Sequence, residues 1–164
     1  MEISKPNETT VLVARIDPVI AELLRRIGPS ADPGNNQRAR DRLYSAPTND
    51  PAEEDFVEDW KEYVEPELAR LFRTAIATIE DDLKKMHADP VTGEATLSIP
   101  SDHLEPWIHG LNQARLVITE RHKMQDEDLD LESMSAADPR AFIVLQLRIY
   151  AHLQWLFLRY LEGH

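Results

Sequence analysis

The sequence predicts an all-α protein: a compact helical bundle of about five helices around a buried C-terminal helix, with a short two-stranded β pair. Three observations favour this class. Proline is frequent and glycine scarce, with 11 and 5 residues, which favours helices separated by stiff breaks. Apolar residues recur at helical spacing in several segments, and just two short segments have the pattern of strands. The 164 residues fit one domain, spanning 1–164.

The first elements are a strand and a helix. Thr9–Arg15 is rich in β-branched residues and is expected to form a strand. Asp17 and Pro18 then favour a helix start, because aspartate caps a helix and proline suits its first turn. Gly28-Pro29 marks the expected end of this helix. Glu94–Ile99 alternates apolar and polar residues, so it is expected to be a second strand that pairs with the first.

The middle of the chain is expected to be helical. A short helix is predicted over Arg38–Tyr44, and Asp50-Pro51 repeats the signal for a helix start. Pro66 interrupts the helix that follows, so a break is expected there. Glu67–His87 then has one apolar side and predicts a long amphipathic helix.

Ser101–His122 is predicted to be a helix with a well-defined apolar face, capped by Ser101. Gly110 lies near that face and indicates a close contact with another helix. A last helix is expected from Asp138-Pro139 to about Leu161, and it is apolar nearly all round, which is typical of a central helix. The charged residues in its middle argue against a membrane span. Residues 1–8 and 125–137 are expected to be mobile.

Composition excludes several functions. The formal net charge of −12 argues against nucleic-acid binding, which requires basic side chains to neutralise phosphates. The chain has no cysteine, so disulfides and thiol chemistry are excluded. The first residues lack the apolar stretch of a signal peptide, and a cytoplasmic location is expected. The acidic runs Glu53-Glu54-Asp55 and Glu80-Asp81-Asp82 are interpreted as solvated helix faces, and Trp60, Trp107 and Trp155 as core residues.

Asn112 and Arg115 are the leading candidates for a binding site, because they project 60° apart at the edge of an apolar helix face. One interpretation is an anchor for a ligand carboxylate or for the backbone of a partner, since arginine can donate two parallel hydrogen bonds to one carboxylate. The other is a structural brace, in which both side chains bond to neighbouring elements. The sequence leaves both possibilities open.

Arg148, His152 and Arg159 project within about 40° of one another on the last helix. They form either a basic groove for an acidic segment or the solvent-facing strip of a buried helix. Arg121, Arg148 and His152 complete the candidate binding set. No catalytic motif is recognised. No metal site and no cofactor are expected, because none of the six histidines follows an acid at the Glu-x-x-His spacing.

Three segments together resemble a known family. They are DPVIAELLRRI at Asp17–Ile27, RLYSAP followed by an acidic helix, and WIHGLNQARLVITER at Trp107–Arg121. The sequence is similar in these segments to the DUF2017 family, a bacterial domain of unknown function. The resemblance implies a compact helical domain with a small β element and no known activity. Some relatives are labelled transcriptional regulators, and others lie beside genes for an adaptor of ATP-dependent proteolysis.

The leading functional hypothesis is therefore a non-enzymatic protein-interaction or regulatory domain, with a possible link to regulated proteolysis. A protein partner or self-association, such as a dimer, is expected, because the last helix has more apolar surface than a small bundle covers. One alternative is a small-ligand binding protein or unrecognised enzyme with an Asn/Arg site. Another is a transcriptional regulator. Nucleic acid and membrane are not expected among the partners.

Overall fold

The computed structural model describes residues 1–130, 132 and 134–163. Helices take up 60% of the chain and strands 13%, in a mixed α/β fold with a four-stranded antiparallel sheet of order β1-β2-β4-β3. The strands are β1 (Glu2–Asn7), β2 (Thr10–Ile16), β3 (His87–Ala88) and β4 (Ala95–Pro100). The α-helices are α1 (Pro18–Arg25), α2 (Ile27–Ala31), α3 (Gln37–Leu43), α4 (Glu54–Tyr63), α5 (Glu65–Leu83), α6 (Leu104–Arg121) and α7 (Ala141–Leu161).

The prediction of an all-α bundle with a two-stranded pair is wrong, because two further strands extend the sheet. The two predicted strands do pair with each other, and Val13 of β2 lies opposite Leu97 of β4. β1 adds to the free side of β2, and β3 to that of β4. The sequence of β1, EISKPN, is polar and contains Pro6, so it has no strand pattern. Proline is tolerated there because β1 is an edge strand.

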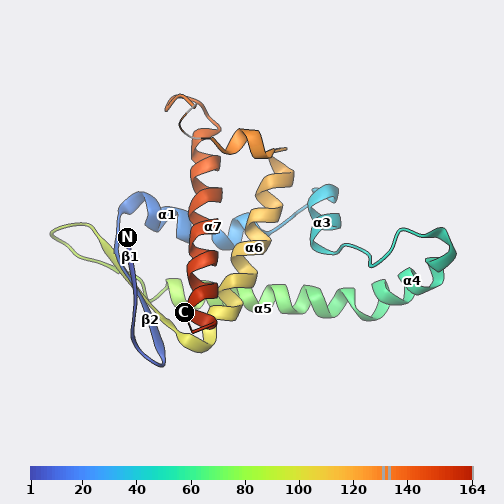
Figure 1. The fold of residues 1–164 in the computed structure, drawn as a ribbon, viewed down its shortest axis with the longest axis horizontal. Helices are drawn as coiled ribbons and strands as arrows, with labels where there is room; N and C mark the ends of the chain where they lie inside the picture. The colour runs from blue at the N-terminus through green and yellow to red at the C-terminus, as the bar shows by residue number, and fades with distance from the viewer. Residues whose placement is uncertain (131, 133, 164) are drawn as a thin grey trace.

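Figure 1 shows how the helices are arranged around the sheet. Helices α6 and α7 run antiparallel at the centre and pack along each other. Helix α5 crosses α6 and continues outward, away from the sheet, to carry α4 at its far end. The end of α7 is tied to the edge of the sheet, where the Tyr160 hydroxyl donates a hydrogen bond to the carbonyl of Ile3 at 3.1 Å.

Helix α6 lies at the centre of the fold. The prediction that the C-terminal helix is the buried, central helix is therefore wrong. Helix α6 packs against α2, α3, α5 and α7, whereas α7 packs mainly along one side of α6. Trp155 on α7 is 52% exposed, so it is not the core residue that the sequence indicates. By length and composition α7 would be able to span a membrane, and 33% of its most apolar window is buried in the fold.

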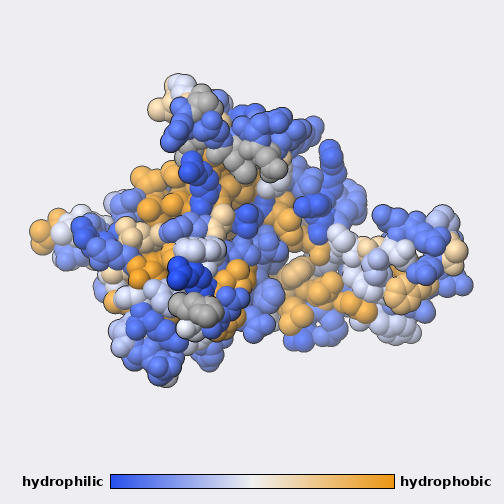
Figure 2. Space-filling model, in the orientation of Figure 1, coloured by the Kyte–Doolittle hydropathy of each residue, from blue (hydrophilic) through white to orange (hydrophobic). Residues whose placement is uncertain are grey.

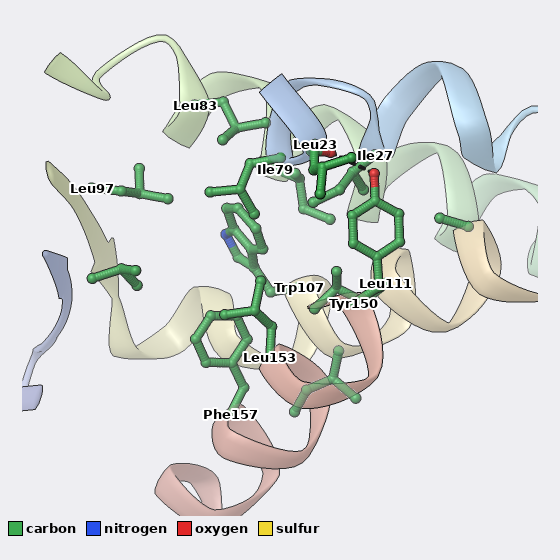
Figure 3. Packing of buried hydrophobic residues seen from close by; sticks show 14 of the residues in the cluster. Leu23, Ile27, Ile79, Leu83, Leu97, Trp107, Leu111, Tyr150, Leu153 and Phe157 are labelled. Carbon is green, nitrogen blue, oxygen red and sulfur yellow. Dashed lines mark hydrogen bonds between the residues drawn. The ribbon is translucent and has the colours of Figure 1, made fainter. Parts of the chain in front are cut away.

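The core lies between the sheet, α1, α2 and α5 on one side and α6 and α7 on the other (Figure 3). Trp107 of α6 is fully buried and meets Phe157 of α7 edge to face, with ring centroids 5.8 Å apart. Such aromatic pairs add to the energy of area burial. Gly110 confirms the predicted close contact: a Cβ at this position would overlap the side chain of Ile79 on α5.

The expected helix starts have mixed outcomes. Asp17 caps α1 as predicted, because its carboxylate accepts a hydrogen bond from the backbone N–H of Ile20 at 2.9 Å. The helix predicted to end at Gly28-Pro29 ends earlier, at Arg25, and the next helix, α2, includes both residues. Ser101 does not cap α6: its hydroxyl is buried without a hydrogen-bond partner among the described residues.

Tyr150 is expected to make the protein sensitive to alkali. Its hydroxyl is buried and donates a hydrogen bond to the carbonyl of Leu23 at 2.5 Å, and burial raises its pKa from 10.0 to about 12. The folded state thus holds the phenolic proton more tightly than the unfolded chain does. Its stabilising effect is full below pH 10 and is lost as pH rises from 10 to 12, a difference of about 3 kcal/mol.

Urea unfolding of the wild type and of Tyr150→Phe between pH 9 and pH 12 measures this effect. The free energy of unfolding is expected to fall more steeply with pH in the wild type, because the phenylalanine variant has no phenol to ionise at this position. Parallel pH curves for the two proteins would contradict the assignment.

Candidate functional site

Three arginines from three different helices surround a hollow in the surface where α3, α6 and α7 meet. Arg42 comes from α3, Arg115 from α6 and Arg148 from α7, and Asn112 of α6 lies beside them. The hollow has a volume of about 270 Å³, and its remaining lining consists of Leu116, Thr119, Leu147 and Ala151. We call this site the arginine hollow. Its lining contains no acidic residue among those that the structure describes.

The arginines of this hollow differ in how they are held. Arg115 is half-buried and donates a hydrogen bond from Nη1 to Oε1 of Gln154 on α7 at 2.7 Å. Arg42 shares the Glu120 carboxylate with Arg38, at 3.5 Å and 3.8 Å respectively. In the part of the chain that the structure describes, neither Arg115 nor Arg148 forms an ion pair. Arg115 and Arg148 therefore contribute positive charge that no ion pair neutralises in the described part of the chain, whereas Arg42 is paired with Glu120.

The backbone positions these side chains in a simple way. Asn112 and Arg115 lie one helical turn apart on α6, so both reach the same side of the helix. Arg148 lies on the neighbouring surface of α7, because α6 and α7 pack antiparallel along their length. Helix α3 packs against α6 and brings Arg42 to the rim of the hollow. The site therefore depends on contacts between three helices and not on a local motif.

The structure brings together three of the five predicted binding residues, Asn112, Arg115 and Arg148. Arg121 lies outside the hollow and donates a hydrogen bond from Nη2 to the carbonyl of Asp32 at 2.6 Å. His152 is also outside it and stacks on Trp155, with ring centroids 6.2 Å apart.

Arg42 is the residue that the sequence does not indicate. It belongs to the short polar helix RARDR, and nothing in that segment shows which helix it packs on.

A second hollow of about 590 Å³ lies between α2, α3 and α5. Both cations and carboxylates line it, among them Arg40 and Arg73 with Glu65 and Glu80. Opposite charges in the same lining reduce the net field on a ligand. This second hollow, although larger, is for that reason a less selective site for a charged group than the arginine hollow.

A buried carboxylate lies elsewhere in the fold, at the junction of α5 and α6. Asp82 is fully buried and accepts hydrogen bonds from Nε1 of Trp107 at 2.9 Å and from Nδ1 of His103 at 2.9 Å. The interpretation of Glu80-Asp81-Asp82 as a solvated face is therefore wrong for Asp82. The carboxylate connects the end of α5 to the start of α6, which is a bracing function. Among the described residues, no group of three or more acids or histidines gathers to hold a metal ion.

Comparison with known proteins gives the family. A family model described as "Domain of unknown function (DUF2017)" matches residues 5–161, nearly the whole chain. The chain belongs to the DUF2017 family. No curated protein matches it, and no solved structure matches it. The description of the DUF2017 family includes no activity, so the geometry of the arginine hollow is the basis for a functional proposal.

Proposed function

We propose that this DUF2017 domain is a non-enzymatic protein-interaction domain that binds an acidic segment of a partner in the arginine hollow. The observation that carries the proposal is the cluster of Arg42, Arg115 and Arg148 on a chain of net charge −12, with no acid among the lining residues that the structure describes. Arg115 and Arg148 form no ion pair among the described residues, so they create a local attraction for anions against the overall acidic charge of the protein.

The chemistry of the hollow fits a carboxylate. Arginine presents a planar fork of N–H donors that matches the two oxygens of a carboxylate, and such charge-assisted bonds are stronger than neutral ones. Asn112 is exposed and offers both donors and an acceptor, which suits a peptide backbone next to the acidic side chain. The bond from Arg115 to Gln154 holds one guanidinium in place before any partner arrives, which lowers the entropic cost of binding.

The size of the hollow favours a protein segment over a metabolite. Sites for drug-sized ligands have volumes of about 300–1,000 Å³ and mostly apolar linings. The arginine hollow, at about 270 Å³, lies below that range and suits one acidic side chain or a small anion. A role in regulated proteolysis, in a cytoplasmic setting, is compatible with a domain that receives acidic segments.

Binding of a dye-labelled hexaglutamate peptide, followed by fluorescence anisotropy, tests this proposal. The double variant Arg115→Ala/Arg148→Ala is expected to bind at least about tenfold more weakly, because each lost charged hydrogen bond contributes about 1.5–3 kcal/mol. Binding to the wild type is also expected to weaken as salt rises from 50 to 500 mM.

Arg25→Ala is the matched control, because Arg25 is an exposed arginine on α1 that does not line the hollow. It removes one positive charge and is expected to leave the affinity nearly unchanged. The hollow variant removes two charges and the control removes one, so a loss of binding free energy in the Arg25 variant that is half or more of the loss in the hollow variant would mean that the peptide senses net charge alone. The hollow would then have no part in binding.

A further inference from the structure

Helix α4 has an apolar face that the chain itself covers only in part. Phe56, Val57, Trp60 and Tyr63 follow one another at helical spacing and share one side of the helix. Phe56 is 54% exposed and Tyr63 is 69% exposed, and no residue of α4 is buried. Figure 1 shows α4 at the far end of α5, away from α6 and α7. We call α4 the arm.

The arm is also strongly acidic. Its ten residues contain five acids and one lysine. At 100° per residue, Asp55 and Asp59 lie along one flank of the apolar face. An amphipathic helix with an exposed aromatic face and an acidic flank matches the kind of segment that a groove with basic residues receives.

A surface with the complementary properties lies on α7. Arg148, His152, Trp155 and Arg159 project on one side of the helix, and all four are exposed. His152 stacks on Trp155, and the guanidinium of Arg159 lies over the same indole ring, 4.9 Å from its centroid. We call these four residues the α7 basic face. Because Arg148 also lines the arginine hollow, the hollow and the α7 basic face form one continuous surface.

We propose that the arm of a second copy of this chain occupies the α7 basic face and the arginine hollow, and that two copies exchange arms around a two-fold axis. The inference rests on the proposed function, since it names the acidic segment that the hollow receives. Asp55 and Asp59, on the flank of the arm, meet the arginines of the partner copy, and the aromatic face of the arm covers Trp155. A two-fold axis makes the contact reciprocal, which is the commonest form of self-association.

The two surfaces lie apart within one chain, so the contact forms between chains. Among the elements of its own chain, the arm packs against α5 and the short 3-10 helix Pro51–Glu53. Figure 2 shows apolar residues at the surface along the part of α5 that leads to the arm and also beside α7. Exposed apolar surface on both halves of a charge-complementary pair favours a specific contact over a purely electrostatic one.

A charge swap on the full-length chain tests the arm exchange. Variant one carries Arg148→Glu and Arg159→Glu, and variant two carries Asp55→Lys and Asp59→Lys. In a dimer of either variant with itself, like charges face each other, but in the mixed dimer both contacts pair opposite charges again. Sedimentation velocity is expected to give a dimer for the wild type, a monomer for each variant alone and a dimer for their equimolar mixture.

Glu8→Lys/Asp102→Lys is the matched control, because it reverses two exposed acids outside the arm. It is expected to remain a dimer, and circular dichroism of each variant checks that the fold is retained. A wild type that is monomeric up to 200 µM would overturn the arm exchange. A dimer that both variants keep would also overturn it, because another face would then make the contact. Hexaglutamate binding is measured separately, so the proposed function stands or fails independently of the dimer.

Discussion

Replacing Asp82 with alanine is expected to lower the free energy of unfolding by about 3–5 kcal/mol. The carboxylate is fully buried, and its removal leaves the Nε1–H of Trp107 inside the core without an acceptor. It also removes the acceptor of His103, which connects the start of α6 to the end of α5. Urea unfolding followed by circular dichroism measures the loss, with the slope of the transition as a check on the denatured state.

The neighbouring acid supplies the control for this prediction. Asp81 is exposed and pairs with Lys84 at the surface, so Asp81→Ala is expected to change stability by less than about 1 kcal/mol. Asp82→Asn retains an oxygen acceptor for Trp107 and is expected to lose less than Asp82→Ala does. If both alanine variants lost the same small amount, Asp82 would not act as the brace between α5 and α6.

Sequence patterns predict those parts of the fold that depend on local chemistry. Asp17 caps α1 where the sequence places a helix start, and Gly110 marks the contact with α5. The strands β2 and β4 alternate in the expected way and pair with each other. Strand β1 escapes prediction because it is a polar edge strand, defined by its hydrogen bonds to β2 and not by an apolar face.

The candidate site is predictable to a similar extent. Asn112 and Arg115 are visible in the sequence because they break the pattern of an apolar helix face, and Arg148 because it breaks that of α7. Arg42 and Gln154 are not visible, because their contribution depends on which helices pack side by side. The burial of Asp82 has the same origin: the spacing of EDD places it on α5, but only the packing of α6 covers it.

Trp107 and Trp155 share the sequence-based expectation of a core position but have opposite outcomes, and they allow a paired experiment. Trp107→Ala is expected to cost about 3–5 kcal/mol, because it removes a fully buried indole, its edge-to-face contact with Phe157 and a donor to Asp82. Trp155→Ala removes the same side chain from a site that is 52% exposed, and the expected cost is below about 1 kcal/mol. Thermal and urea unfolding at dilute protein concentration compare the two monomers.

The effect of the same pair on self-association separates packing from docking. Trp155 lies in the α7 basic face, so Trp155→Ala is expected to weaken the dimer while leaving the monomer stable. Trp107 does not belong to that face, so Trp107→Ala is expected to lower the stability of the monomer before it affects the dimer. If Trp155→Ala destabilised the monomer as much as Trp107→Ala did, α7 would be covered on that side within its own chain. The α7 basic face would then not be free to receive the arm of a second copy.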